Sequence, residues 1–184
     1  PHAGEVLELH LRNYGGPFST HVFNTMKETD LVRLEGPLGT FFVRETSDKP
    51  IVFVASGTGF APIKAMVEHH LHHAGQRPMT LYWGARRPAD LYLNELVEGW
   101  VRDHGLKYVP VVSNAEPQDA WTGRTGFVHR AVMADHPDLS GHQVYACGAP
   151  IVVSSARDDF IAHCQLPATE FFPDMFVSGS TPSA

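Results

Sequence analysis

Residues 51–66, IVFVASGTGFAPIKAM, hold the strongest structural signal in this 184-residue chain. The apolar run predicts a short strand buried on both faces, and Gly57 and Gly59 follow it directly. Residues 60–62 then begin a helix, and a proline suits that first turn because the N–H that it lacks would have had no partner. Glycines at such a junction let the backbone approach a diphosphate, whose charge the free N–H groups of the helix favour. Taken alone, the stretch is also compatible with a plain tight turn.

The same pattern, a short apolar run before a helical stretch, recurs along the chain. The runs are IVFVA from residue 51, MTLYW from 79, KYVPVV from 107 and QVYAC from 143. Their starts lie 28, 28 and 36 residues apart, close to the roughly 30 residues of a βαβ unit. We therefore predict an α/β fold with a doubly wound, five-stranded parallel sheet, in a domain that spans 49–177.

The first 48 residues follow a different pattern. Apolar and polar residues alternate over 5–12, and 31–36 and 40–44 look similar, so each segment predicts a half-buried strand. Between them, GGPFST followed by HVFNTM predicts a turn into a short helix, with Ser19 or Thr20 as its cap. We interpret this region as an incomplete antiparallel β-barrel segment, too short to close.

Composition and charge exclude several classes of protein. With 43% hydrophobic and 18% charged residues the chain is typical of a globular domain, and its net charge of -6 provides no basic surface for nucleic acid. No run approaches the roughly 18 apolar residues of a membrane span. Two cysteines cannot form a disulfide framework, which favours a reducing, cytoplasmic location.

Two further features concern the chain ends and the histidines. The start at Pro1 suggests an excerpt of a longer protein, and the polar tail 178–184 is expected to be disordered. Among the twelve histidines, His69 and His73 are four residues apart and share a helix face. No carboxylate or cysteine stands at a convincing spacing beside them, so we expect a solvated helix surface and no metal site.

The residues that follow the apolar runs predict a ligand site at the strand ends. The second run leads into Arg86, where a ribose or phosphate contact is expected, although an exposed loop arginine needs no ligand. Ser113 follows the third run, and the absence of Arg or Lys at that strand end favours NADH over NADPH. The fourth run ends in Cys147, which either borders a nicotinamide ring or is a small buried hydrophobe. Because neighbouring strand ends line one crevice, we expect Cys147 and Gly57 to share a site.

Seven short motifs then occur in an order that resembles a known family. They are GGPFST, GPLGTF, GTGFAP, YWGARR, WTGRTGFV, YACGAP and FFPDMF, which together cover nearly all of the chain. The order resembles the flavin and NAD(P) modules of ferredoxin reductase-like oxidoreductases, among them oxygenase reductase components, CDP-6-deoxy-glucoseen reductases and NAD(P)H-flavin reductases. The resemblance implies FAD and NADH or NADPH as cofactors. It also implies that 1–48 is the C-terminal part of an FAD-binding barrel domain and that 49–177 is an NAD(P)-binding domain.

The resemblance assigns roles to individual residues. It implies contacts with the FAD diphosphate for Gly16, Phe18, Ser19 and Thr20. It implies contacts with the diphosphate of the nicotinamide nucleotide for Gly57, Thr58, Gly59 and Pro62. Beside the nicotinamide ring it places Cys147, Gly148 and Pro150, near the flavin ring Phe176, and on the ribose side Arg86. We therefore predict Cys147 and Phe176 as the catalytic residues.

The function that this resemblance implies is hydride transfer from NAD(P)H to FAD, with electrons passed on to an iron–sulfur centre or ferredoxin-type acceptor protein. The family's flavin-ring motif, an Arg, any residue, Tyr and Ser, is missing, so this chain is expected to bind pyridine nucleotide yet hold FAD poorly. A 2Fe–2S cluster would belong to a longer parent protein, because the chain lacks the cysteine cluster. Two alternatives stay open: a reductase that releases free reduced flavin, and a noncatalytic nucleotide-binding module.

Overall fold

A computed structural model describes residues 6–36, 38–73 and 75–177, which backbone contacts divide into two units, one up to Thr40 and one from Phe41 onward. The predicted disordered tail and the start of the chain lie outside the described residues. The sequence placed the change of domain at residue 48, eight residues after the division between the units.

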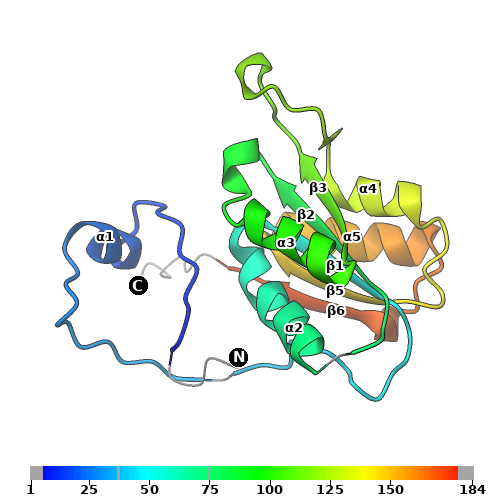
Figure 1. Cartoon of the computed structure of the whole chain (residues 1–184), viewed down its shortest axis with the longest axis horizontal. Helices are drawn as coiled ribbons and strands as arrows, with labels where there is room; N and C mark the ends of the chain where they lie inside the picture. Colours follow the sequence, from blue (N-terminus) through cyan, green and yellow to red (C-terminus); the bar gives the residue numbers. More distant parts are fainter. Residues whose placement is uncertain (1–5, 37, 74, 178–184) are drawn as a thin grey trace, which may run out of the picture. The chain divides into compact units, whose positions relative to one another are not determined.

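The larger unit contains a parallel sheet whose strands follow the order β4-β3-β2-β1-β5-β6 (Figure 1). The strands are β1 Ile51–Ser56, β2 Met79–Ala85, β3 Lys107–Val112, β4 Arg124–Thr125, β5 Gln143–Gly148 and β6 Phe171–Met175. The four predicted runs begin strands at residues 51, 79, 107 and 143, as expected. The predicted count of five was wrong, because the sheet has six strands. No apolar run marks β4, which is two exposed residues long.

Helices cover both faces of this sheet (Figure 1). They are α2 Phe60–His72 and α3 Asn94–His104 on one face, and α4 Val128–Asp135 and α5 Pro150–His163 on the other. Successive strand residues point to opposite faces, so Phe53 packs beneath α2 and α3 while Val54 packs beneath α4 and α5. Both side chains are at most 1% exposed, and each buried side chain of this size contributes roughly 1.5–3 kcal/mol. Within the described residues, no helix combines the length and apolar character that a bilayer span requires.

Among its described residues, the N-terminal unit contains one helix, α1 Pro17–Asn24. Gly16 is its N-cap and Pro17 its first residue, so the expected cap at Ser19 or Thr20 was wrong. Proline begins the helix because its fixed φ already suits the first turn. No residue of α1 is buried.

The strands predicted over 5–12 and 31–36 are absent from the described residues of this unit. Their apolar side chains are exposed instead, with Leu7 at 76% and Leu31 at 101% of full exposure. An alternating sequence becomes a strand only when a neighbouring strand accepts its backbone hydrogen bonds, and no such neighbour is described here.

The third predicted strand, 40–44, is also absent, for a different reason. In the larger unit Phe41 and Val43 pack against the core that α2 and α3 cover, and the Arg44 N–H donates to Tyr145 Oη at 2.8 Å. The Arg77 guanidinium donates to the carbonyl of Arg44 at 2.9 Å. Because side chains satisfy these backbone groups, the segment needs no neighbouring strand.

Candidate nucleotide-binding site

The strand order places one special position in the sheet, between β1 and β5. From the central β1 the chain moves outward through β2, β3 and β4, then returns to lay β5 and β6 on the other side of β1. Connections that leave in opposite directions open a crevice at the carboxyl ends of the two strands, where ligands bind in open α/β sheets. These ends are followed by η1, a 3₁₀ turn over Gly57–Gly59, and by the start of α5.

Two glycines bring these strand ends together. Ala55 of β1 pairs with Cys147 of β5, so Gly57 follows the strand that lies directly beside the strand of Cys147. A Cβ added at Gly59 would overlap the Cys147 carbonyl and lie 2.7 Å from the Gly148 Cα. A Cβ at Gly148 would lie 2.5 Å from the Ser56 carbonyl oxygen. Backbone atoms form both contacts and cannot rotate away, so the approach of the two tips requires glycine at both positions.

Gly57 differs from these glycines because the space beside it is open. Its φ of +54° lies in the left-handed region, and no atom stands within 4 Å of where its Cβ would be. Thr58 is half-buried, and Pro62 is the third residue of α2. The space beside Gly57 is therefore open at the start of α2, where the Phe60 N–H already donates to the carbonyls of Gly57 and Thr58. The positive end of the helix dipole lies here, which favours an anion.

Trp83, for which the sequence predicts no role at the site, forms a hydrogen bond with this loop. Trp83 of β2 is fully buried, and its indole Nε1–H donates to the Gly57 carbonyl at 3.1 Å. Its ring stacks on Phe60, the first residue of α2, with centroids 4.0 Å apart. In the sequence Trp83 is one more apolar residue of a buried strand, and no local signal reveals its partner.

Cys147, Gly148 and Phe176, predicted to border the reacting rings, are brought together by β5 and β6. Gly148 pairs with Met175, and the Phe176 N–H donates to the Gly148 carbonyl at 2.9 Å. The Phe176 ring is 42% exposed. The Cys147 side chain is 0% exposed, and its Sγ lies 3.7 Å from Asp174 Oδ2.

The ionisation of Cys147 follows from this burial. Burial and the neighbouring Asp174 carboxylate raise the pKa of the thiol far above its ordinary value. Cys147 is thus a neutral thiol at pH 7, and it is buried rather than exposed at the end of β5. Its predicted catalytic role stays a prediction.

The strand ends of β2 and β3 carry Arg86 and Ser113, which lie close together. The Asn114 N–H donates to the Arg86 carbonyl at 2.9 Å, and Ser113 donates to the Ala85 carbonyl from its backbone N–H at 2.9 Å and from Oγ at 3.3 Å. The Arg86 side chain is exposed, and no described side chain pairs with its guanidinium. It is therefore available to a ligand.

The next residue, Arg87, is occupied by acidic neighbours. Its Nε and Nη2 donate to the two carboxylate oxygens of Asp119, each at 2.8 Å, and its Nη1 contacts Glu116. The hydrogen bond from Arg87 lowers the pKa of Asp119 below its ordinary value. Asp119 is the last residue of η3, Pro117–Asp119, and Glu116 is the residue directly before it. No sequence motif predicts that these two carboxylates bind Arg87.

The remaining predicted contacts lie in two places. Pro150 is the first residue of α5 and is exposed, directly after Gly148 and Ala149. The residues predicted for FAD lie in the N-terminal unit, where α1 groups them, namely Gly16, Phe18, Ser19 and Thr20. Ser19 Oγ donates to the Gly16 carbonyl at 3.1 Å, and the Phe18 ring is 58% exposed.

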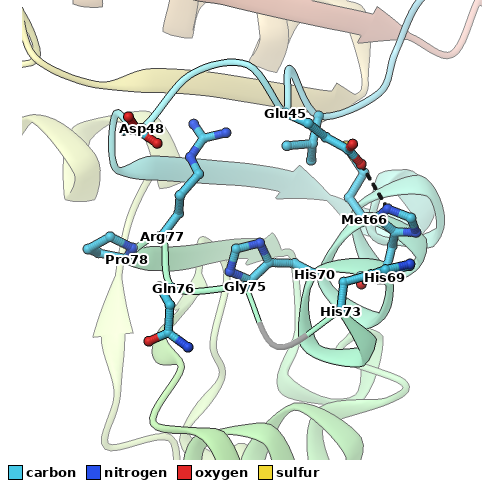
Figure 2. A pocket seen from close by; sticks show the side chains of 11 residues that line it. Glu45, Asp48, Met66, His69, His70, His73, Gly75, Gln76, Arg77 and Pro78 are labelled. Carbon is cyan, nitrogen blue, oxygen red and sulfur yellow. Dashed lines mark hydrogen bonds and ion pairs between the residues drawn. The ribbon is translucent and has the colours of Figure 1, made fainter.

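A pocket of about 590 Å³ lies at the opposite, amino-terminal edge of the sheet (Figure 2). It is bounded by the end of α2 and by the segments that precede β1 and β2, and no predicted site residue lines it. His69 and His73, the pair considered as metal ligands from the sequence, line this pocket. Glu45, from the segment before β1, approaches His69, with Oε1 2.9 Å from Nε2. Among the described residues, no group of three or more His, Cys, Asp or Glu side chains is placed to hold a metal ion.

Comparison with known proteins agrees with this geometry. The model of the oxidoreductase NAD-binding domain family matches residues 53–158. The chain is 48% identical over 173 residues to the CDP-6-deoxy-L-threo-D-glycero-4-hexulose-3-dehydrase reductase of Yersinia pestis, covering 93% of this chain and 51% of that protein. It is 31% identical over 181 residues to the NAD(P)H-flavin reductase of Aliivibrio fischeri, covering 95% of this chain and 75% of that protein.

A solved structure shares the fold. The Amycolatopsis cytochrome P450 reductase GcoB superposes with a TM-score of 0.67 at 30% identity, over 78% of this chain and 43% of GcoB. The chain spans about half the length of its Yersinia relative. The chain belongs to the oxidoreductase NAD-binding domain family, with the ferredoxin reductase-like relatives that its motifs predict.

Proposed function

We propose that this chain is the pyridine-nucleotide-binding part of a flavin-dependent NAD(P)H oxidoreductase, which passes hydride from NAD(P)H to FAD and electrons on to an iron–sulfur centre or ferredoxin-type acceptor. The observation that carries the proposal is the meeting of the β1 and β5 tips at the reversal of strand order, with Gly59 and Gly148 in backbone contact. The relatives named as reductases support the reaction class.

In this proposal each part of the crevice has one task. The loop Gly57–Gly59 and the first turn of α2 bind the diphosphate, and Arg86 binds on the ribose side. Gly148 and Pro150 would border a bound nicotinamide, with the neutral Cys147 buried behind them, and the exposed Phe176 would be the aromatic residue on the flavin side. The bound cofactors supply the hydride chemistry, whereas these residues supply position and exclude water. A 2Fe–2S cluster, where the system has one, belongs to another domain or protein.

The acceptor and the compartment belong to this proposal as well. Support for an acceptor protein comes from the names of GcoB, a cytochrome P450 reductase, and of the Yersinia dehydrase reductase. Both cysteines are free and buried, which suits a reducing cytoplasm.

We assign NADH as the preferred nucleotide because the carboxylates of Glu116 and Asp119 occupy Arg87. A 2′-phosphate at this strand end would compete with two carboxylates for the Arg87 fork and would have to rely on Arg86 as its cation. The double change Glu116→Gln and Asp119→Asn should release Arg87 and lower the Kd for NADPH about tenfold relative to NADH, the effect of gaining one charge-assisted hydrogen bond.

Calorimetric titration with both nucleotides measures this ratio. Asp103→Asn, which removes an exposed charge near the end of α3, is the matched control and should leave the ratio unchanged. An unchanged NADPH-to-NADH ratio in the double variant contradicts the assignment.

The reaction itself is tested with the purified chain, FAD and ferricyanide as an artificial acceptor. NADH-dependent ferricyanide reduction that requires added FAD supports the oxidoreductase. NADH binding without turnover supports the noncatalytic module. No uptake of NADH or NADPH in calorimetry contradicts the nucleotide site.

A second candidate is a reductase that releases free reduced flavin, favoured by the 75% coverage of the Aliivibrio flavin reductase. The two are separated by the choice of flavin, because a reductase that releases free flavin uses flavin as a substrate. Saturation kinetics with FMN and riboflavin as well as FAD support the second candidate, whereas turnover with FAD alone supports the first.

A further inference from the structure

We propose that Trp83 is a positioning residue for the diphosphate loop: its indole N–H fixes the first peptide of Gly57–Gly59 in the orientation that receives a nucleotide. This inference rests on the proposed nucleotide site and adds a residue to it. Trp83 does not touch the nucleotide in this account and acts through the backbone of the loop.

The register of the sheet puts Trp83 in reach of this loop. Trp83 pairs with Ala55 on the neighbouring strand, two residues before Gly57. Side chains two residues apart on a strand point to the same face, so the indole extends beneath the loop that follows β1. There Nε1 lies 3.1 Å from the Gly57 carbonyl oxygen, and the ring stacks on Phe60 with an interplanar angle of 14°. One side chain thus contacts both the beginning of the loop and the helix that leaves it.

The hydrogen bond determines which way the next amide points. In a planar trans peptide the C=O and the N–H point in opposite directions. Because Trp83 and the Phe60 N–H both donate to the Gly57 carbonyl, that oxygen is held toward the protein. The Thr58 N–H is therefore held on the other side, away from the indole. Gly57 itself has a φ of +54°, in the left-handed region that favours glycine.

A packing role alone does not account for this arrangement. Trp100 belongs to the same aromatic cluster, with its ring 6.1 Å from Phe60, yet its indole forms no hydrogen bond with a described residue. Trp83 is 0% exposed and Trp100 7%, so both indoles pack in the core, but only the Trp83 indole donates to the loop. An amide fixed before the ligand arrives avoids the entropy of ordering it on binding.

The test compares Trp83→Phe with Trp100→Phe, which both exchange an indole for a phenyl ring in one cluster. Trp83→Phe should raise the Kd for NADH and for ADP-ribose about fivefold, the effect of one lost hydrogen bond, and leave the Kd for adenosine unchanged. Trp100→Phe should lower the thermal midpoint as a core substitution does, without altering the three dissociation constants. Calorimetry at a temperature where both variants are folded gives these values.

Three outcomes are decisive. Undiminished NADH binding by Trp83→Phe, or an equal loss in Trp100→Phe, overturns the role of Trp83 and leaves the proposed function intact. Wild-type protein that binds neither NADH nor ADP-ribose overturns the proposed function and this inference with it. A fivefold loss confined to Trp83→Phe and to the ligands with a diphosphate supports the inference.

A measurement on wild-type protein keeps the test independent of the folding of the variants. The chain has three tryptophans and therefore three indole N–H signals in a ¹⁵N-edited NMR spectrum. The Trp83 signal should be protected from solvent exchange and should shift when ADP-ribose is added, because the carbonyl that it contacts borders the ligand. A Trp83 signal that exchanges freely, or that stays in place at saturating ADP-ribose, overturns the inference.

Discussion

Gly59 and Gly148 show how the absence of two side chains lets the ends of β1 and β5 approach each other closely. At each position the nearest atoms to an added Cβ belong to the backbone or Cβ of the opposite strand end. Such contacts are relieved only by moving β1 and β5 apart, which would break the pairing of Ala55 with Cys147. Gly57, only two residues away, has open space and requires glycine for its φ instead.

The two kinds of glycine predict different costs. Gly59→Ala should lower the free energy of unfolding by about 2–3 kcal/mol, because overpacking against a rigid backbone is not relieved. Gly57→Ala should cost only about 1 kcal/mol, the strain of a left-handed alanine. Urea titration followed by tryptophan fluorescence measures both, and a smaller loss for Gly59→Ala than for Gly57→Ala would refute the account of close approach.

Arg86 and Arg87 form a natural pair of variants at the end of β2. Arg86→Ala should raise the Kd for NADH several-fold without changing the thermal midpoint, because the guanidinium is exposed and pairs with no described side chain. Arg87→Ala should lower the thermal midpoint, because it leaves Asp119 and Glu116 without their cation. The reverse pattern, in which Arg86→Ala lowers stability and Arg87→Ala weakens NADH binding, would show that Arg87 and not Arg86 contacts the ligand.

At the scale of elements, both units contain segments whose hydrophobic pattern predicts a strand, but among the described residues only segments of the larger unit form one. The alternation in 6–12 and 31–36 is as regular as in many strands, yet the described part of the chain places no strand beside these segments, and their apolar side chains are exposed. In the larger unit β1 has partners on both sides and helices on both faces. Pattern alone therefore did not decide between strand and coil, whereas the availability of a partner did.

Leu31 and Leu81 test this difference with one substitution. Leu81→Ala should lower the free energy of unfolding by about 3 kcal/mol, because Leu81 is 0% exposed in the core beside α2 and α3. Leu31→Ala should change it by less than about 0.5 kcal/mol, because Leu31 is 101% exposed. Urea titration again suffices, since all three tryptophans lie in the larger unit. A large loss on Leu31→Ala would show that this leucine is buried.

At the scale of the whole molecule, we expect the free energy of unfolding to fall in acid because several histidines are partly or fully buried. Burial is the first cause that lowers the pKa of four histidines below 6.5, and they lie around both faces of the sheet, at His70, His129, His136 and His142. Below about pH 6.5 the unfolded chain binds protons at these positions that the folded chain does not, so stability falls as the pH drops. Carboxylates whose pKa is lowered by a partner, such as Asp135 beside Arg124, begin to lose their contribution only below about pH 3.8.

The midpoint of thermal unfolding should therefore fall between pH 7 and pH 5. The rings of His136 and His142 are 5.1 Å apart, so protonation of one opposes protonation of the other. His142→Asn removes one of these groups and should make the fall smaller, whereas His104→Asn at the exposed end of α3 should leave it unchanged. Calorimetric scans across this range test the sign, and a midpoint that rises toward pH 5 would contradict it.

By itself the sequence determined where four strands begin and which strand ends carry glycine, because apolar runs and the residues that interrupt them are local. It also determined the family, because seven short motifs keep their order. Only the tertiary structure decided that Gly59 meets Cys147, that Trp83 holds the Gly57 carbonyl, and that Asp119 rather than a ligand occupies Arg87. These contacts join residues on different elements, and such a pairing exists only once the sheet has set its register.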